Sequence, residues 1–281
     1  MNDKTAALIA SRGNPERLIA TCMSLYRLAQ KPRLLEFCIR ADLDDTDTHT
    51  AALRLEKHMP VDVFLGPRPM SLGAEIEMMV KRADAGFYHV LNDDVLPLTC
   101  NWDAPQFEMR KRHPAFVSCW VLPEVMAATG RMSPDYPVVT REWIDAAGRL
   151  FTPYFPYWFD DRWLADVWML ATGKTIVPLA INMSARKRRT QRMRDLDFWF
   201  SFYQWLEDER VAQAQRAADA LGFKVDVRRD RAGLISFLRT RHDEDRKSIL
   251  ETHRRLFDPG EPDVAYLAAK AFAEQRMQVA A

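Results

Sequence analysis

In its first hundred residues the sequence alternates short apolar runs with amphipathic stretches, and this alternation constrains the fold more than any other feature. Short apolar runs are typical of buried strands, whereas apolar residues three and four positions apart are typical of helices with one packed face. Strands that alternate with helices build a mainly parallel sheet, because each helix returns the chain to the start of the next strand. The sequence therefore predicts an α/β fold.

The pattern places elements of both kinds along this first part of the chain. The expected strands are residues 6–11, 37–41, 61–65 and 87–91. The expected helices are residues 15–29, 48–57 and 72–85. Asn14 is expected to be the N-cap of the first helix, with Pro15 at its first position, where the missing N–H costs nothing. His89 lies inside an expected strand and is predicted to be a core residue.

The middle and the end of the chain have different patterns. Residues 97–156 are rich in Pro and Trp, which predicts loops with one strand at 115–120 and a short helix at 141–147. A helix at 161–171 ended by Gly173 and a buried strand at 175–181 are expected next. From Thr190 onward, long charged helical patterns are broken near Gly222 and Pro259. A helical extension over residues 186–281 is therefore expected to follow an α/β domain over residues 1–185.

Charge and cysteine content exclude several classes of protein. Lys and Arg total 40 against 39 Asp and Glu, so the net charge of +1 creates no global field that attracts nucleic acid or a membrane surface. The four cysteines form no C-x-x-C pair, and no H-E-x-x-H motif occurs, which argues against a zinc site. No apolar stretch is long enough to span a bilayer. A globular, thiol-containing cytoplasmic protein without stable membrane insertion is expected.

Acidic residues follow two of the expected strands. Asp42, Asp44 and Asp45 come after the second strand, and the triplet 92–94, Asn-Asp-Asp, comes after the fourth. Because ligands of an open parallel sheet bind at the carboxyl ends of the strands, both groups are expected in one crevice. Carboxylate oxygens there suit Mg²⁺ or Mn²⁺, which in turn would hold a diphosphate. The alternative is that the first group caps a helix and the second forms an ordinary turn.

Short motifs follow the four strands in a recognisable order, ASRGNP (10–15), RADLDDT (40–46), GP (66–67) and NDD (92–94), and are followed by YPVVTRE (136–142) and FDDRWL (159–164). Over residues 4–182 this order resembles the nucleotide-diphospho-sugar transferases of the GT-A fold, particularly the family-2-like inverting glycosyltransferases. The resemblance implies a GT-A, Rossmann-like catalytic domain. Its nucleotide-binding half would be residues 1–96 and its acceptor half residues 97–185.

The resemblance also implies roles for individual residues. Those expected to line the nucleotide pocket are Ser11, Arg12, Asp42, Asp44, Asn92 and Asp93. In the family's D-x-D motif the last acidic residue chelates the metal ion. The matching triplet begins with an amide, Asn92, which leaves Asp94 as the best ligand for Mn²⁺ or Mg²⁺ and Asp93 as the second. The candidates for a third ligand are Asn182, Asp195 and Asp197.

The family's catalytic base aligns with the second residue of the Asp160-Asp161 pair, so Asp161 is the expected base and Asp160 its alternate. An inverting transfer needs a carboxylate that takes the proton of the acceptor hydroxyl as it attacks the anomeric carbon. The alternative is that both carboxylates only favour a helix N-terminus. The preceding aromatic run, with Tyr157 and Trp158, is expected either to wall the acceptor site by stacking on a sugar ring or to pack beneath a loop.

Two further stretches leave alternatives open. Residues 186–194 hold six basic residues in nine, which indicates a solvated surface, a diphosphate contact through Arg186 and Arg188, or a site for nucleic acid or anionic lipid. An aromatic stripe over residues 198–205 is expected to pack on the sheet or to form the seam of a homo-oligomer.

The leading hypothesis is a metal-assisted inverting glycosyltransferase that moves a sugar from a UDP- or GDP-sugar donor to a hydroxyl acceptor. A sugar-phosphate nucleotidyltransferase is the second candidate, although residues 11–15 lack the glycine-rich, lysine-bearing loop of that class. A nucleic-acid-binding module that uses the basic run is third, because the protein as a whole is nearly neutral.

Overall fold

The computed structural model describes residues 2–121, 123, 134–156, 158–185, 194–253 and 262–279. The chain groups into two compact units, each made of several segments. The first unit consists of Met1–Pro69, Glu75–Asp145 and Ile176–Lys187. The second unit consists of Met70–Ala74, Ala146–Thr175 and Arg188–Ala281. The functional boundary expected at residue 185 stays a prediction.

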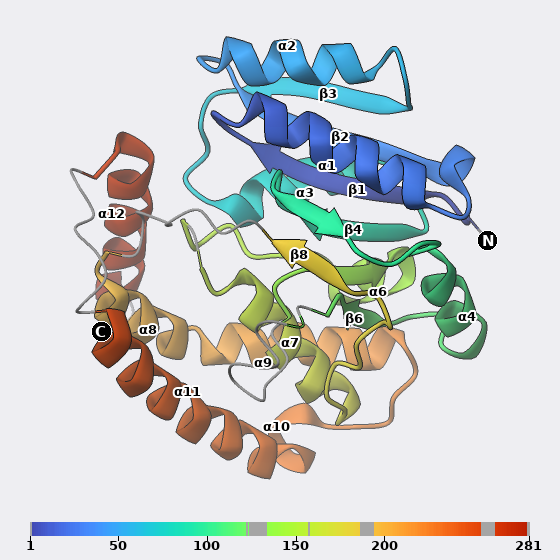
Figure 1. The fold of residues 1–281 in the computed structure, drawn as a ribbon. Coiled ribbons are helices and arrows are strands. Elements are labelled where there is room, and N and C mark those ends of the chain that lie inside the picture. The colour runs from blue at the N-terminus through green and yellow to red at the C-terminus, as the bar shows by residue number, and fades with distance from the viewer. Residues whose placement is uncertain are drawn as a thin grey trace. The chain divides into compact units, whose positions relative to one another are not determined.

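The first unit is built on a six-stranded sheet in the order β3-β2-β1-β4-β7-β6 (Figure 1). Its parallel strands are β1 (Thr5–Ser11), β2 (Leu35–Asp42), β3 (Val61–Gly66) and β4 (Phe87–Leu91). Beyond β4, the antiparallel β7 (Pro137–Thr140) and β6 (Val117–Cys119) complete the sheet. The four parallel strands are those that the sequence predicts, and their carboxyl ends lie at one edge.

Helices with one apolar face pack on this sheet. α1 (Pro15–Leu28) buries Leu18, Cys22 and Leu25, whose three- and four-residue spacing puts them on one side of the helix. The other helices that begin in the first hundred residues are α2 (Thr46–Leu55), the short 3₁₀ helix η1 (Pro32–Leu34) and α3 (Leu72–Arg82). α1 and α2 begin directly after the carboxyl ends of β1 and β2. Their N-termini therefore lie beside the strand ends that carry the candidate site residues.

The segment 97–156 contains more regular structure than the sequence indicates. α6 (Arg141–Ala147) has the expected bounds, but α4 (Ala104–Arg112) was not expected. The residues that α4 buries are Gln106, Phe107 and Arg110, two of which are polar. Because polar side chains occupy its inner face, α4 has no apolar stripe that sequence periodicity could detect.

The strand predicted at residues 175–181 is wrong. That segment is irregular, and the strand β8 lies just after it, at Met183–Ala185, paired antiparallel with β5 (Val95–Pro97). The Leu179 N–H donates to the Cys119 carbonyl, so the chain still runs beside β6. Pro178 has no N–H to donate, and the N–H of Ile181 turns back to the Leu179 carbonyl. The ladder is thereby interrupted although the residues are apolar.

The core next to α4 is polar at its centre. His89 on β4 is fully buried, and its Nδ1 accepts a 3.1 Å hydrogen bond from the indole N–H of Trp120. Its Nε2 contacts the Oε1 of Gln106, whose amide donates to Thr5. This pattern fits a neutral imidazole with its proton on Nε2. The core role predicted for His89 is confirmed, and Trp102 and Trp120 are buried beside it.

The second unit is helical over its C-terminal part, as the sequence predicts (Figure 1). Its helices are α7 (Asp160–Thr172), α8 (Leu196–Trp205), α9 (Glu207–Ala220), α10 (Val227–Asp230), α11 (Ala232–His253) and α12 (Val264–Val279). The break near Gly222 follows the end of α9, where Gly222 has a φ of +76° that favours glycine. The break expected near Pro259 lies outside the described residues.

Aromatic side chains of α8 form the core of the second unit. Trp199, Phe202 and Tyr203 lie within ring-contact distance of Phe155, and Tyr203 stacks on Phe159 with ring centroids 5.1 Å apart. These contacts lie within the second unit, whereas the sequence predicts that the stripe packs on the sheet or forms an oligomer seam. A homo-oligomer stays a prediction.

A buried charge cluster joins four helices of the second unit, α7, α8, α9 and α11. Asp166 on α7 accepts a 2.6 Å hydrogen bond from the hydroxyl of Tyr203, and its carboxylate lies 2.9 Å from Nε2 of His242 on α11. Burial opposes the ionisation of Asp166, but the interactions with His242, Arg210 and Tyr203 outweigh it and lower the pKa of Asp166. The cluster thus fixes α7, the helix that begins with Asp160 and Asp161.

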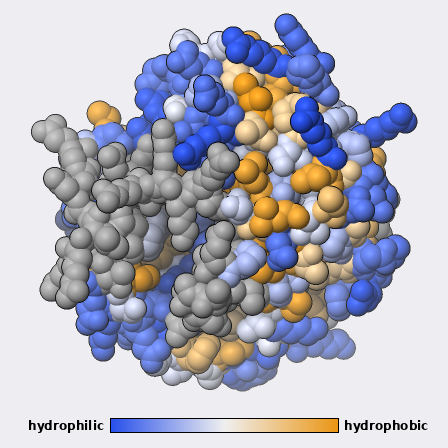
Figure 2. All heavy atoms as spheres, viewed as in Figure 1, coloured by the Kyte–Doolittle hydropathy of each residue, from blue (hydrophilic) through white to orange (hydrophobic). Residues whose placement is uncertain are grey.

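The face seen in Figure 2 carries hydrophilic side chains along most of its edge and a mixture of polar and apolar side chains toward its middle. Across the ranges that the structure describes, no helix combines the length and the apolarity needed to cross a bilayer.

Candidate functional site

The chain turns sharply after β1, and this turn begins the candidate site. Gly13 has a φ of +66°, a left-handed conformation that side chains rarely adopt. Its N–H donates a 2.6 Å hydrogen bond to Asp45, which is also the N-cap of α2 and accepts from the N–H of Thr48. Burial opposes the ionisation of Asp45, yet these hydrogen bonds lower its pKa. Asp45 therefore caps a helix, which is the alternative role considered for the acidic residues after the second strand.

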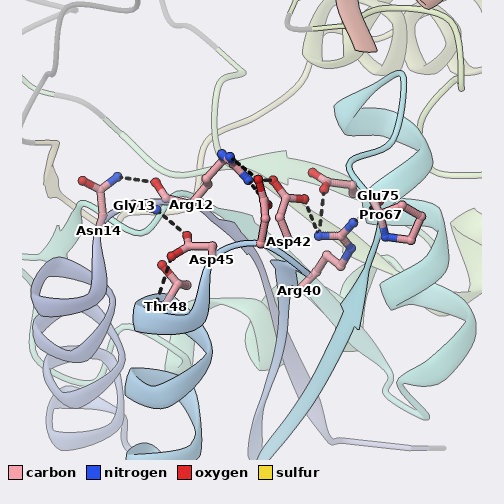
Figure 3. Close-up of polar contacts among 10 residues, drawn as sticks. Arg12, Gly13, Asn14, Arg40, Asp42, Asp45, Thr48, Pro67 and Glu75 are labelled. Atoms are coloured by element: carbon pink, nitrogen blue, oxygen red, sulfur yellow. Dashed lines mark hydrogen bonds and ion pairs between the residues drawn. The ribbon is translucent and has the colours of Figure 1, made fainter. Parts of the chain in front are cut away.

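Arg12 joins the ends of β1 and β2 (Figure 3). One guanidinium nitrogen lies 2.6 Å from both Asp42 and Asp44, and the other lies 2.9 Å from Asp44. Hydrogen bonding to Arg12 lowers the pKa of Asp44 to about 2, and the same contacts raise the pKa of Arg12. Three residues predicted to line the nucleotide pocket are thus brought together, although 30 positions separate Arg12 from Asp42.

A second arginine, buried in β2, holds Asp42 from the other side. Arg40 is 1% exposed, and it donates a 2.8 Å hydrogen bond to Asp42 and a 2.5 Å hydrogen bond to the carbonyl of Pro67. Its guanidinium also lies 3.5 Å from Glu75 on α3 (Figure 3). Each oxygen of Asp42 therefore accepts from a different arginine, which fixes the orientation of the carboxylate.

Asp93, the middle residue of the triplet after β4, binds residues at the end of β1 and next to it. Asp93 accepts a 2.7 Å hydrogen bond from the Ser11 hydroxyl and a 3.2 Å hydrogen bond from Asn14, while Thr21 of α1 donates to the Asp93 carbonyl. Asn14 directly precedes α1 as expected, but its side chain binds Asp93 instead of capping the helix. Asp93 is thus tied to the end of β1 and the start of α1.

Asn92 and Asp94, the outer residues of the triplet, contact side chains other than those that bind Asp93. The carboxylate of Asp94 lies 3.8 Å from the guanidinium of Arg17 on α1. The amide of Asn92 donates a 3.4 Å hydrogen bond to the hydroxyl of Tyr136. Burial raises the pKa of Tyr136, and the negative charges of Asp94 and Asp135 raise it further. Tyr136 thus lies within electrostatic reach of the carboxylate that is predicted to bind metal.

The donor chemistry of Asn92 and Asp94 fits a hard divalent cation that arrives with a substrate. A carboxylate and an amide oxygen are ligands that Mg²⁺ accepts, and Mg²⁺ sites commonly take only one or two protein ligands, with phosphate oxygens and water completing the set. Among the residues that the structure describes, no group of three or more His, Cys, Asp or Glu side chains could hold a metal ion by itself. The residues therefore fit a cation shared with a diphosphate.

Of the residues considered for a third ligand, Asp195 and Asp197 use their carboxylates in other contacts, whereas the contact of Asn182 is made by its backbone. Asp195 accepts hydrogen bonds from Tyr266 and Lys270, and Asp197 pairs with Arg246. The backbone N–H of Asn182 donates to Thr99.

The expected catalytic base pair lies at the start of α7, within the second unit. Asp160 is 5% exposed and accepts a 3.4 Å hydrogen bond from the Thr152 hydroxyl, whereas Asp161 is half-buried. Phe159 before them has a φ of +82°, which costs about 1–2 kcal/mol for a residue other than glycine. The burial of its ring among Phe155, Phe200 and Tyr203 offsets this strain.

The first residues of α3, up to Ala74, belong to the second unit and pack against the same region. A Cβ at Gly73 would lie 1.9 Å from the carbonyl oxygen of Thr152 and 2.9 Å from Oδ1 of Asp160. Only glycine fits at this position without a shift of the backbone. Gly73 therefore sets how closely the Met70–Ala74 segment approaches the start of α7 within the second unit.

Of the residues expected to contact the acceptor or the diphosphate, Tyr157, Arg186 and Arg188 lie outside the described residues. Trp158 is half-buried, and its ring centroid lies 6.5 Å from that of Phe159.

Sequence reasoning also passed over residues that join the cluster. Gly13, Arg40 and Tyr136 lie within the motifs, but the sequence pattern predicts no role for them. A charged residue inside an apolar strand, as in the sequence Cys-Ile-Arg-Ala-Asp of β2, is a signal that could have identified Arg40, because a buried arginine needs a carboxylate partner.

No protein-family model matches the sequence, and no curated protein matches it. Solved structures do match the fold. The mannosyltransferase PcManGT from Pyrobaculum calidifontis, in complex with GDP-Man and Mn²⁺, has a TM-score of 0.58 and 13% identity, with 98% of this chain and 88% of that chain covered. S. aureus TarS 1–349 in complex with UDP-GlcNAc has a TM-score of 0.55 and 12% identity, with 78% of this chain and 71% of that chain covered.

GalNAc-T7 with UDP, GalNAc and Mn²⁺ is a third similar structure, with a TM-score of 0.52 and 12% identity. The match covers 66% of this chain and 44% of that chain. Together with the sheet order and the C-terminal helices, these likenesses identify the fold that the sequence predicts: the chain has the GT-A fold.

Proposed function

We propose that this protein is a glycosyltransferase that uses a UDP- or GDP-sugar as donor. The observation that carries the proposal is the convergence of Arg12, Asp42 and Asp44 at the carboxyl ends of β1 and β2, on a GT-A fold. In an open α/β sheet this edge is where ligands bind. The similar structures named above contain GDP-Man, UDP-GlcNAc or UDP, which supports a nucleotide-sugar donor.

We propose further that a divalent cation, Mn²⁺ or Mg²⁺, assists the transfer. Carboxylates outnumber guanidinium groups in the cluster, since Arg12, Arg40 and, at longer range, Arg68 lie near the four carboxylates Asp42, Asp44, Asp45 and Glu75. A diphosphate needs added positive charge to bind beside them. When bound, the cation would neutralise the charge that develops on the departing diphosphate. Asp94 would hold it. Asp93, the second ligand that the sequence predicts, accepts hydrogen bonds from Ser11 and Asn14, so we propose Asn92 as the second oxygen donor.

The transfer is proposed to invert the anomeric centre, with Asp161 as the general base. Asp161 lies in the first turn of α7, where the helix N-terminus stabilises a negative charge by about 0.3–1 kcal/mol. Its neighbour Asp160 is buried against Thr152, whereas Asp161 is half-buried, so Asp161 is better placed to accept a proton from an acceptor hydroxyl. A positioned base contributes about 10²- to 10⁴-fold in rate.

Binding of the nucleotide tests the proposals that the donor is a UDP- or GDP-sugar and that a divalent cation assists. Melting curves recorded with UDP or GDP, with and without Mn²⁺, should show the largest rise in Tm when nucleotide and Mn²⁺ are both present. A ligand at 100 times its Kd stabilises the folded state by about 2.7 kcal/mol, which raises Tm by several degrees. Asp94→Asn should lose the increment due to Mn²⁺. Absence of stabilisation by either nucleotide would contradict the proposal.

The catalytic step is tested separately with Asp161→Asn. Release of UDP or GDP from the matching nucleotide sugar should fall by about 10²-fold or more, while the stabilisation by nucleotide and Mn²⁺ stays unchanged. Asp160→Asn is the matched control, because it removes the adjacent carboxylate. If Asp160→Asn abolishes nucleotide release and Asp161→Asn does not, Asp160 is the base.

A further inference from the structure

We infer that Arg17, the third residue of α1, binds the diphosphate of the donor nucleotide. The inference rests on the proposed function, in which Asp94 holds a cation that is shared with the diphosphate. Arg17 lies just outside the motif ASRGNP (10–15), so the resemblance to the GT-A family gives it no role. The placement of α1, the face on which Arg17 lies and the contact with Asp94 carry the inference.

Two hydrogen bonds hold the N-terminal half of α1 against the turn that follows β4. β1 and β4 are parallel neighbours in the sheet, and α1 begins shortly after β1 ends. The amide of Asn14 donates a 3.2 Å hydrogen bond to the Asp93 carboxylate, and the hydroxyl of Thr21 donates a 3.0 Å hydrogen bond to the Asp93 carbonyl. The helical residues between Asn14 and Thr21 therefore lie beside the triplet 92–94.

Arg17 lies on the face of α1 that is turned to this triplet. Residues four positions apart are neighbours on one face of a helix, and Thr21, which contacts Asp93, comes four positions after Arg17. The guanidinium of Arg17 lies 3.8 Å from the carboxylate of Asp94, a distance longer than a hydrogen bond. The Arg17 side chain is 36% exposed, so a ligand from solution can reach it.

The charge of Arg17 is better matched by a diphosphate than by Asp94 alone. The N–H groups of a helix's first turn carry partial positive charge, which disfavours a cation there and favours an anion. A diphosphate carries more negative charge than one carboxylate, and its oxygens can accept two parallel N–H bonds from a guanidinium. A phosphate that shares a cation with Asp94 is a neighbour of that carboxylate, as Arg17 is.

The test is the affinity of UDP or GDP for Arg17→Gln, measured by calorimetry with and without Mn²⁺. Arg17→Gln should weaken binding by about 10-fold or more in both conditions, the effect of losing one hydrogen bond to a charged group. Added NaCl should weaken binding to the unmutated protein more than to Arg17→Gln, because salt screens the attraction between the guanidinium and the diphosphate.

Arg27→Gln is the matched control. Arg27 is an exposed arginine in the last turn of the same helix, about 15 Å from Arg17 along the helix axis. Its replacement removes the same charge from the protein and should leave both the affinity and its salt dependence unchanged. An equal loss from Arg17→Gln and Arg27→Gln would mean that only the net charge matters, which overturns the inference.

The comparison of the two Mn²⁺ conditions gives two further results that overturn it. A loss confined to the measurements with Mn²⁺ would mean that Arg17 acts only through Asp94 and the cation. Unchanged or tighter binding would mean that Arg17 only neutralises Asp94 in the protein without ligand. If Arg17→Gln fails to fold, Arg17→Lys decides instead, because it keeps the charge but loses the planar fork and should bind UDP or GDP more weakly than the unmutated protein.

Failure of the proposed function gives a different result. If the unmutated protein binds neither UDP nor GDP with Mn²⁺, the nucleotide-sugar proposal fails and the inference fails with it. If the unmutated protein binds them and Asp94→Asn removes the effect of Mn²⁺, the proposed function stands, and the Arg17 variants then decide on Arg17 alone.

Discussion

At the scale of single residues, buried polar side chains in the first unit are held by partners that fix their protonation. His89 is the clearest case, because its two ring nitrogens face Trp120 and Gln106 and neither faces a carboxylate. Burial in this uncharged surrounding lowers the pKa of His89 to about 4. A proton added to the ring would leave the hydrogen-bond donor of Trp120 without its acceptor.

The lowered pKa predicts a loss of stability in acid. Above pH 6.5 the imidazole is neutral in both the folded and the unfolded state. As the pH falls from 6.5 to about 4, only the unfolded state gains the proton, so the free energy of unfolding decreases by up to about 3 kcal/mol through this residue, and below about pH 4 this contribution levels off.

Urea denaturation between pH 7 and pH 4 measures this effect. His89→Gln should show a shallower decrease of the unfolding free energy with falling pH than the unmutated protein. His58→Gln changes an exposed histidine and should keep the full decrease. Parallel pH profiles for His89→Gln and the unmutated protein would show that His89 is not the group responsible.

At the scale of elements, the placement of helices depends on close approaches that single glycines allow. Gly73 is the second residue of α3, and Gly233 is the second residue of α11. A Cβ at Gly73 meets the backbone of Thr152, whereas a Cβ at Gly233 has no neighbour within 4 Å. A side chain is therefore excluded at the second position of α3 but has room at the second position of α11.

Replacing each glycine by alanine tests this difference. Gly73→Ala should lower the free energy of unfolding by about 1–3 kcal/mol or more, because a backbone carbonyl must move to admit the methyl group. Gly233→Ala should raise it, by at most about 1 kcal/mol, through the lower chain entropy of the unfolded state. Urea midpoints measure both changes. Equal midpoints for the two variants would contradict the close approach at Gly73.

At the scale of the whole molecule, positive and negative charges balance, so the binding of a charged ligand depends on the groups in the site itself. With 40 basic and 39 acidic side chains, the chain has a net charge of +1, so no long-range field steers a nucleotide toward it. In the proposed function, affinity for the nucleotide must therefore come from the groups at the carboxyl ends of the strands. Those groups derive from three stretches of sequence, 11–14, 42–45 and 92–94, that the sheet order β2-β1-β4 places side by side.

Hydrogen exchange can test whether these stretches act as one site. Saturating UDP or GDP with Mn²⁺ should slow amide exchange in residues 11–14, 42–45 and 92–94 together. Asp94→Asn should reduce the protection at all of them, because the Mn²⁺-dependent part of the affinity is lost. Protection confined to a single stretch would contradict a shared site.

The sequence by itself determined the parallel strands, the helices that follow them and the helical C-terminal region. These elements have regular apolar spacing, and the spacing is a local property of the chain. It also placed Arg12, Asp42 and Asp44 near one another, because parallel strands present their carboxyl ends at one edge. It could not find α4, whose inner face is partly polar, and it took the apolar segment 175–181 for a strand although Pro178 interrupts the ladder.

Only the tertiary structure decided which partners these side chains take. The contact of Arg12 with Asp42 spans 30 positions, that of Ser11 with Asp93 spans 82, and that of Asn92 with Tyr136 spans 44. Such pairs depend on which strands are neighbours and in which register they pair. Hydrogen bonds form between atoms that the folded sheet brings within about 3 Å, and no local pattern of residues specifies that distance.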